Sequence, residues 1–164
     1  MGKTLTLVCA ALLLLAAGGP NSAAQGTATP PAPATTPVGH WKTIDDATGK
    51  EKSVVVLWMQ DGQLFGRVEK ILDPDPGNPE EKCLKCSGDL KNKPIAGLQI
   101  LWGLHPNSAD AKGAEWAGGF ILDPHSGTSY KCLIALEDNG RKLKVRGFIG
   151  FSLLGRTQYW YRVD

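Results

Sequence analysis

The chain lacks an excess of charge of either sign. Of its 164 residues, 18 are Lys or Arg and 16 are Asp or Glu, and the basic residues are dispersed. This balance gives no electrostatic reason to expect binding to nucleic acid or to an anionic membrane surface. The sequence also lacks a Gly-x-Ser-x-Gly nucleophile elbow, because the run from Gly150 to Gly155 has a different spacing. We therefore expect no nucleic-acid partner and no enzyme activity.

Residues 1–24 are typical of a secretory signal peptide. Lys3 precedes an apolar run from Leu5 to Ala17, and Ser22 and Ala24 fit the −3 and −1 positions of a cleavage site. The run has 13 residues, whereas a spanning helix needs about 20, so cleavage is favoured over a retained anchor. A lipoprotein signal at Cys9 is disfavoured because the apolar region continues past it. We therefore expect a periplasmic or secreted protein with no membrane span after cleavage.

Residues 25–38 form a low-complexity stretch in which four prolines lie among Ala and Thr. Such a composition has little to bury and predicts a disordered linker. Folded structure is expected to begin at Gly39. Residues 39–164 are enough for one domain and too few for two comfortable cores.

Short apolar runs separated by turn signals dominate the chain after Gly39, and no helical period extends over 12 residues. Branched side chains at 54–56 favour β-structure, and Asp61-Gly62 favours a tight hairpin. The pattern predicts eight strands, over residues 39–44, 53–59, 64–72, 98–104, 115–122, 128–137, 142–149 and 156–163. An all-β, antiparallel, eight-stranded up-and-down barrel follows, because closing a meander removes its exposed edges. A two-sheet sandwich is the alternative.

The two ends of this domain carry a possible closure contact. Trp41 follows Gly39 in the first predicted strand, and the last strand places Arg156 and Arg162 on one face. First and last strands are neighbours in a closed barrel, so one of these arginines is expected to cover the Trp41 indole. The arrangement resembles lipocalin barrels, whose first strand carries Gly-x-Trp and whose last strand supplies a packing arginine.

A series of longer motifs carries a second resemblance. In order along the chain they are Gly39-His40-Trp41-Lys42-Thr43-Ile44-Asp45, Asp61-Gly62-x-x-x-Gly66-Arg67, Lys93-Pro94-Ile95-x-Gly97, Trp116-x-Gly118-Gly119-x-Ile121-x-Asp123-Pro124, Gly127-x-x-Tyr130-x-Cys132 and Leu143-Lys144-Val145-Arg146-Gly147-Phe148-Ile149-Gly150 with Gly155-Arg156-Thr157-Gln158-x-Trp160. On these motifs the chain resembles the bacterial domain of unknown function 2147 family. The resemblance implies an exported bacterial envelope protein with a lipocalin-like barrel and brings no established activity.

One long stretch, from Asp73 to Lys93, interrupts the strands. Asn78 as an N-cap, Pro79 at the first helical position and Gly88 as a stop predict one or two helical turns that carry Cys83 and Cys86. A loop of this length in a small domain is usually functional or mobile. On a barrel it is a candidate lid over the open end.

Cys83, Cys86 and Cys132 are interpreted as disulfide candidates. A thioredoxin-type site needs a preceding strand and a βαβ setting, and both are missing. A zinc site needs two further ligands from Cys132 and the histidines at 40, 105 and 125, which have no supporting spacing. A disulfide in an oxidising compartment is favoured, either between 83 and 86 or from one of them to Cys132. No metal and no cofactor is expected.

The strand aromatics lead to the functional hypothesis. Large rings in strands either fill a core or line a ligand cavity, and a mid-strand arginine either anchors a polar head group or faces solvent. The candidate ligand-binding residues are Trp58, Arg67, Trp102, Trp116, Tyr130, Arg146 and Trp160. We interpret the chain as a non-enzymatic lipocalin-like module for a small apolar or amphipathic molecule. The alternative is a structural or protein-interaction module of the bacterial envelope.

Overall fold

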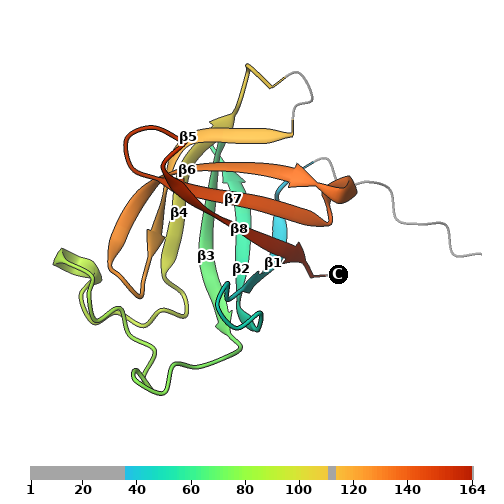
Figure 1. Ribbon diagram of the computed structural model, residues 1–164. Helices are drawn as coiled ribbons and strands as arrows, with labels where there is room; N and C mark the ends of the chain where they lie inside the picture. The colour runs from blue at the N-terminus through green and yellow to red at the C-terminus, as the bar shows by residue number, and fades with distance from the viewer. Residues whose placement is uncertain (1–35, 111–113, 164) are drawn as a thin grey trace, which may run out of the picture. The chain divides into compact units, whose positions relative to one another are not determined.

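Eight antiparallel strands close into a barrel in the computed structural model, which describes residues 36–110 and 114–163 (Figure 1). Each strand pairs with its sequence neighbours, and β1 also pairs with β8. The strands are β1 Gly39–Ile44, β2 Glu51–Gln60, β3 Gln63–Ile71, β4 Gln99–Pro106, β5 Glu115–Asp123, β6 Thr128–Glu137, β7 Lys142–Phe148 and β8 Gly155–Arg162. The predicted barrel is confirmed, and the sandwich alternative is wrong.

The predicted signal peptide at 1–24 and residues 25–35 of the predicted linker lie outside the described residues. Contacts with the barrel extend back from Gly39 to Thr36, because Arg162 donates a hydrogen bond to the Thr36 carbonyl. Within the part of the chain that the structure describes, no helix is long and apolar enough to cross a bilayer.

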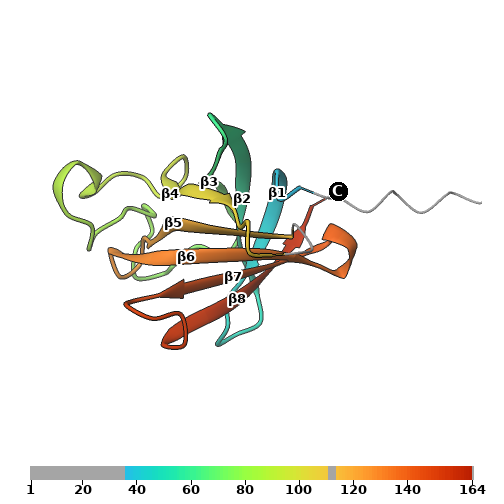
Figure 2. The ribbon, with the colours of Figure 1, turned by 90° about the horizontal axis from the view of Figure 1, so that it is seen from above.

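The up-and-down order places the connections at two different ends of the barrel. The β1–β2, β3–β4, β5–β6 and β7–β8 loops share one end, which we call the mouth. Three of these loops, β3–β4, β5–β6 and β7–β8, lie on the side away from the C-terminus in both views (Figures 1 and 2). The opposite end carries the β2–β3 turn, where Asp61 and Gly62 take positive φ values of 50° and 75°. This is the geometry that a two-residue hairpin requires.

Apolar side chains fill the barrel at the end opposite the mouth. Alternate residues of each strand point inward, as the buried positions Val55 and Leu57 of β2 show. The fully buried side chains of this packed end are Trp41, Leu57, Leu64, Leu104, Ile134 and Leu143. Because large side chains fill the interior here, little room for a ligand is left at this end.

Arg162 closes the packed end. Its guanidinium carbon lies 4.3 Å from the centroid of the Trp41 ring, and its nitrogens donate hydrogen bonds to the carbonyl oxygens of Gly140, Val38 and Thr36. An alanine at position 39 would bring its Cβ to 2.7 Å from Arg162 Nη1. Glycine is favoured at this position because its φ of 133° is one that other residues rarely adopt, and because the guanidinium lies against its backbone.

The β3–β4 loop contains no helix at Pro79–Cys86, so the predicted helical turns there are wrong. Asn78 does bond the backbone four residues on, since its Oδ1 accepts from Lys82 N at 3.2 Å. Glu81, however, adopts a positive φ of 47°, which ends any right-handed helical course. Gly88 begins a short 3₁₀ helix, η1 Gly88–Leu90, instead of ending a helix.

Cys83 and Cys86 form a disulfide in this loop, and Cys132 is free and buried in β6. The option that joined Cys132 to one of the loop cysteines is therefore wrong. The disulfide segment packs on the β5–β6 turn, because Cys83 Sγ lies 3.1 Å from the Pro124 carbonyl oxygen. At the same place an alanine at position 127 would put its Cβ 2.2 Å from the Lys85 carbonyl oxygen. The long loop is thus held against the mouth of the barrel.

Candidate functional site

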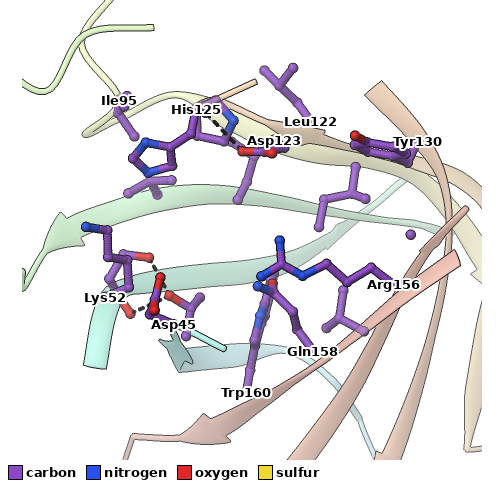
Figure 3. Close-up of a pocket in the computed structure, with 18 of the residues that line it drawn as sticks. Asp45, Lys52, Ile95, Leu122, Asp123, His125, Tyr130, Arg156, Gln158 and Trp160 are labelled. Atoms are coloured by element: carbon purple, nitrogen blue, oxygen red, sulfur yellow. Dashed lines mark hydrogen bonds between the residues drawn. The ribbon is translucent and has the colours of Figure 1, made fainter. Parts of the chain in front are cut away.

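A cavity of about 840 Å³ occupies the mouth half of the barrel (Figure 3). Its lining comes from the strands and from all four mouth loops, and the β3–β4 loop contributes Asp75, Glu81 and Ile95. The loop predicted to be a lid therefore forms part of the cavity wall. The volume lies within the range of about 300–1,000 Å³ that is usual for small-molecule sites.

The cavity wall is largely apolar. Inward positions of neighbouring strands supply branched and aromatic side chains, because residues that alternate along a strand share one face. These lining residues are Ile44, Val68, Ile71, Ile95, Ile100, Ile121, Leu122, Tyr130, Val145, Phe148, Ile149, Leu154 and Trp160. These side chains form a surface against which the apolar part of a small molecule could pack.

A small polar patch lies on the cavity wall where β8, β1 and β2 meet. Thr43 pairs with Trp160 on one side and with Ser53 on the other, and the Thr43 and Ser53 hydroxyl oxygens are 2.8 Å apart. Trp160 is 2 % exposed, and within residues 36–110 and 114–163 no protein atom accepts a hydrogen bond from its Nε1. A buried donor without an acceptor is costly, so Nε1 is the polar atom of this patch that most lacks a partner.

Charged side chains surround the mouth of the cavity. Arg156 and Asp123 approach from different walls (Figure 3), and Arg156 Nε donates to Asp46 Oδ2 at 2.6 Å. The pKa of Asp45 is lowered, chiefly because the Thr48 backbone N–H and hydroxyl donate to its carboxylate. Lys52 donates to the Asp73 carbonyl at 2.8 Å. The rim thus carries both signs of charge and can meet polar groups of a ligand.

Glu81 places a second unsatisfied polar atom at this site. Its Oε1 accepts from the Asp75 backbone N–H, whereas its Oε2 is buried and has no hydrogen-bond donor within the described ranges. Glu81 lines the cavity from the β3–β4 loop, whereas Trp160 lines it from β8. Two residues that line the cavity therefore each hold a buried polar atom without a hydrogen-bond partner in the described ranges, one a donor and one an acceptor.

The cavity includes two of the seven predicted ligand-binding residues, Tyr130 and Trp160. Trp116 is buried in β5 and pairs with Ile134, one of the packed-end side chains, and it does not line the cavity. Arg156, predicted for barrel closure, lies at the rim instead, and Arg162 alone covers Trp41.

The other four predicted ligand-binding residues, Trp58, Arg67, Trp102 and Arg146, face outward and do not line the cavity. Trp58 alternates with the buried Val55 and Leu57, stacks on Phe65 at 5.9 Å between ring centroids and lies under Arg67. Trp102 stacks on Phe120 at 6.0 Å.

Arg146 also points outward, because its neighbours Val145 and Gly147 face the cavity. Its guanidinium donates to the Ser152 and Leu153 carbonyls and to the Thr157 hydroxyl. It therefore fixes the β7–β8 loop and does not anchor a head group inside the barrel.

Sequence reasoning missed the aliphatic side chains that make most of the wall, such as Val68 and Ile100. A usable signal was present in β7, where Leu143 and Val145 alternate with lysines and mark the inward parity. Leu143 pairs with Trp160, and paired residues of neighbouring strands point to the same side of the sheet. The inward direction of Leu143 therefore also gives the inward direction of Trp160 in β8.

The site offers little for catalysis among the described residues. Asp123, His125 and Ser126 are close in sequence, but the Asp123 carboxylate accepts from His125 N and Ser126 Oγ and so stabilises the β5–β6 turn. Burial raises the pKa of the Cys132 thiol to about 12, which keeps it protonated and unreactive. Within the described ranges no group of three or more His, Cys, Asp or Glu side chains could hold a metal ion.

Comparisons with known proteins agree with this architecture. A family model described as "uncharacterized protein conserved in bacteria (DUF2147)" matches residues 39–162. Among solved structures, the Helicobacter pylori protein HP1028, described as belonging to the lipocalin family, matches with a TM-score of 0.65 and 19% identity over 79% of this chain and 84% of that chain. At this identity the likeness shows the fold, which is lipocalin-like. No curated protein matches the sequence significantly.

Proposed function

The chain belongs to DUF2147, a family of uncharacterized bacterial proteins, and on that premise we propose that its barrel is a non-enzymatic module that binds a small apolar or amphipathic molecule. The proposal is supported by the cavity of about 840 Å³ at the mouth of a lipocalin-like barrel. Such a volume accepts one molecule of drug or fatty-acid size. The protein acts in the periplasm or outside the cell, and the Cys83–Cys86 disulfide supports an oxidising compartment.

The main observation behind the proposal is the unpaired Nε1 of Trp160, a residue of the largely apolar cavity wall. Any apolar molecule of suitable size can fill an apolar cavity. A buried N–H group, however, favours a ligand that carries a hydrogen-bond acceptor. The expected ligand therefore has an apolar body and an oxygen, such as a carboxylate or carbonyl, placed against Trp160. The unpaired Glu81 Oε2 favours a hydroxyl or amine elsewhere on the ligand.

Tryptophan fluorescence tests the proposal with a long-chain fatty acid such as palmitic acid as the probe. Of the five tryptophans, Trp160 lines the cavity, whereas Trp58 stacks on Phe65 outside it. We expect the probe to change the emission of the wild type and of Trp58→Phe, and to leave that of Trp160→Phe nearly unchanged. Calorimetry should show an affinity about 3- to 10-fold lower for Trp160→Phe, because the ring is kept and one hydrogen bond is lost.

A cavity-blocking variant provides a second, independent test. Gly147 lines the cavity, and a Cβ added there would make ordinary contacts of 3.4 Å with Tyr130 and 3.5 Å with Ile121. Gly147→Leu should therefore fold and fill the cavity, whereas Gly147→Ala serves as its matched control. Binding of palmitic acid with equal affinity by all three proteins would show that the ligand does not enter the barrel and would refute the proposal.

A further inference from the structure

The β7–β8 loop exposes four large apolar side chains at the mouth of the barrel (Figure 1, dark red). Ile149, Phe151, Leu153 and Leu154 are 66%, 82%, 88% and 76% exposed, and residues 149–155 contain no charged side chain. Scattered exposed apolar residues are common on protein surfaces, but a contiguous group of this kind marks an interaction site.

The exposed loop is fixed by hydrogen bonds to the barrel. Arg146 donates to the carbonyl oxygens of Ser152 at 2.7 Å and Leu153 at 3.1 Å, and to Thr157 Oγ1 at 2.7 Å. Within the loop, Leu154 N donates to the Phe151 carbonyl at 3.1 Å. The outward direction of these side chains is therefore built into the fold.

The outer surface of β6 and β7, which extends from this loop toward the packed end, carries positive charge, although the chain as a whole is nearly neutral. The outward positions of β6 and β7 hold four basic residues and one acidic residue: Lys131, Lys142, Lys144, Arg146 and Glu137. We call this surface the basic face.

Exposed tyrosines of β8 border the basic face. Tyr159 and Tyr161 are 38% and 44% exposed, and Lys142 Nζ lies 3.9 Å from the centroid of the Tyr159 ring. Tyrosine and lysine side chains combine an apolar body with a polar tip, which suits the headgroup layer of a membrane.

We infer that the β7–β8 loop and the basic face dock on an anionic phospholipid bilayer. The apolar loop would enter the acyl-chain boundary, and the lysines of the basic face would lie among the anionic headgroups, while Arg146 holds the loop in place. A second copy of the chain is a poorer occupant, because a two-fold contact through the same surface would set basic face against basic face.

The position of the loop connects this docking surface to the cavity. Ile149 and Leu154 line the cavity, whereas Phe151 and Leu153 do not. A bilayer in contact with the loop would therefore adjoin the cavity mouth, and an apolar molecule could pass between them with little exposure to water. This route rests on the proposed function, whereas the docking itself does not.

Vesicle sedimentation of the mature chain tests the docking. The wild type should sediment with phosphatidylglycerol vesicles and more weakly with phosphatidylcholine vesicles. The double variant Phe151→Ser/Leu153→Ser should bind phosphatidylglycerol vesicles at least about tenfold more weakly, because two apolar side chains no longer enter the bilayer. Leu84→Ser, which removes an exposed leucine from the β3–β4 loop, is the matched control and should bind like the wild type.

Four results would overturn the inference. The first is wild-type chain that stays in the supernatant with phosphatidylglycerol vesicles, and the second is a double variant that binds as tightly as Leu84→Ser. The third is a wild-type dimer in sedimentation velocity that the double variant abolishes, since the loop would then belong to a second copy. The fourth is equal binding to phosphatidylglycerol and phosphatidylcholine vesicles, which would show that the basic face does not bind anionic headgroups.

The docking and the ligand proposal fail separately. The double variant should still bind palmitic acid in solution, because its two substitutions lie outside the cavity lining. Conversely, Gly147→Leu should lose palmitic acid and still sediment with the vesicles. Loss of both properties in either variant would indicate misfolding, which circular dichroism of the same samples detects.

Discussion

Replacing Arg162 by alanine removes the group that ties together the two ends of the barrel. The guanidinium donates to the Gly140, Val38 and Thr36 carbonyls at 2.7, 2.8 and 2.8 Å and covers the Trp41 ring. Hydrogen bonds from a charged donor contribute about 1.5–3 kcal/mol each when buried. Two of these three bonds are solvent-exposed, so about 1 kcal/mol each is the appropriate value. With about 1.5 kcal/mol for the part-buried bond to Gly140 and about 1 kcal/mol for the cation–π contact, Arg162→Ala should cost about 4.5 kcal/mol.

Urea denaturation followed by circular dichroism measures this loss as a difference in the free energy of unfolding. Arg162→Lys should lose about 2 kcal/mol, because an ammonium keeps the charge over the ring but cannot reach three carbonyls. Arg156→Ala is the control, since Arg156 forms an exposed pair with Asp46 that is expected to contribute less than about 1 kcal/mol. Equal losses in Arg162→Ala and Arg156→Ala would refute this account of closure.

Two further expectations concern the long loop and the buried thiol. Gly127→Ala should destabilise the protein by more than about 2 kcal/mol, because a side chain at φ +71° would also collide with the Lys85 carbonyl; Gly62→Ala, at φ +75° with open space around it, should cost only about 1 kcal/mol. Equal losses would show that the loop does not pack on the β5–β6 turn. Cys132, whose pKa burial raises to about 12, should react with iodoacetamide at pH 8 at least about a hundredfold more slowly in the native protein than in urea, and rapid native labelling would contradict its burial.

The barrel could be predicted because its signals are local. Turn pairs such as Asp61-Gly62 and alternating segments such as Leu143 to Gly147 specify hairpins one at a time, and a series of hairpins with a closure contact leaves few topologies. The predicted strand at 39–44 has the same bounds in the structure, and the one at 128–137 does as well.

The cavity could not be predicted because β2 and β4, two of the strands around it, do not alternate apolar and polar residues along the sequence. The run from Val54 to Trp58 is apolar throughout, so the sequence gives no sign that Trp58 faces outward while Leu57 faces inward. In β4, Ile100 and Leu101 are both buried, and the pairing with β3 shifts register nearby. Parity along such strands depends on bulges and pairing, which are properties of the whole sheet.

The prediction of helical turns in the β3–β4 loop is wrong for a different reason. Asn78 and Pro79 carry a genuine helix-start signal, but the Cys83–Cys86 disulfide and the packing on the β5–β6 turn set the backbone there. Tertiary contacts override local propensity when the segment is short. The predicted strand at 142–149 extends one residue into the apolar β7–β8 loop, since sequence alone does not distinguish an exposed apolar residue such as Ile149 from a buried one.

The eight strands run between the packed end of the barrel and the end that encloses the cavity, so the two halves of a strand have different surroundings. Near Arg162 the backbone is backed by tightly packed side chains, so we expect its amides to exchange slowly with solvent. Around the cavity fewer contacts resist local fluctuation, so we expect opening there to cost less free energy. A ligand of the proposed kind would then enter and leave by partial opening of the mouth, while the packed end keeps the topology. We therefore expect one barrel to combine a rigid packed end with a more mobile mouth.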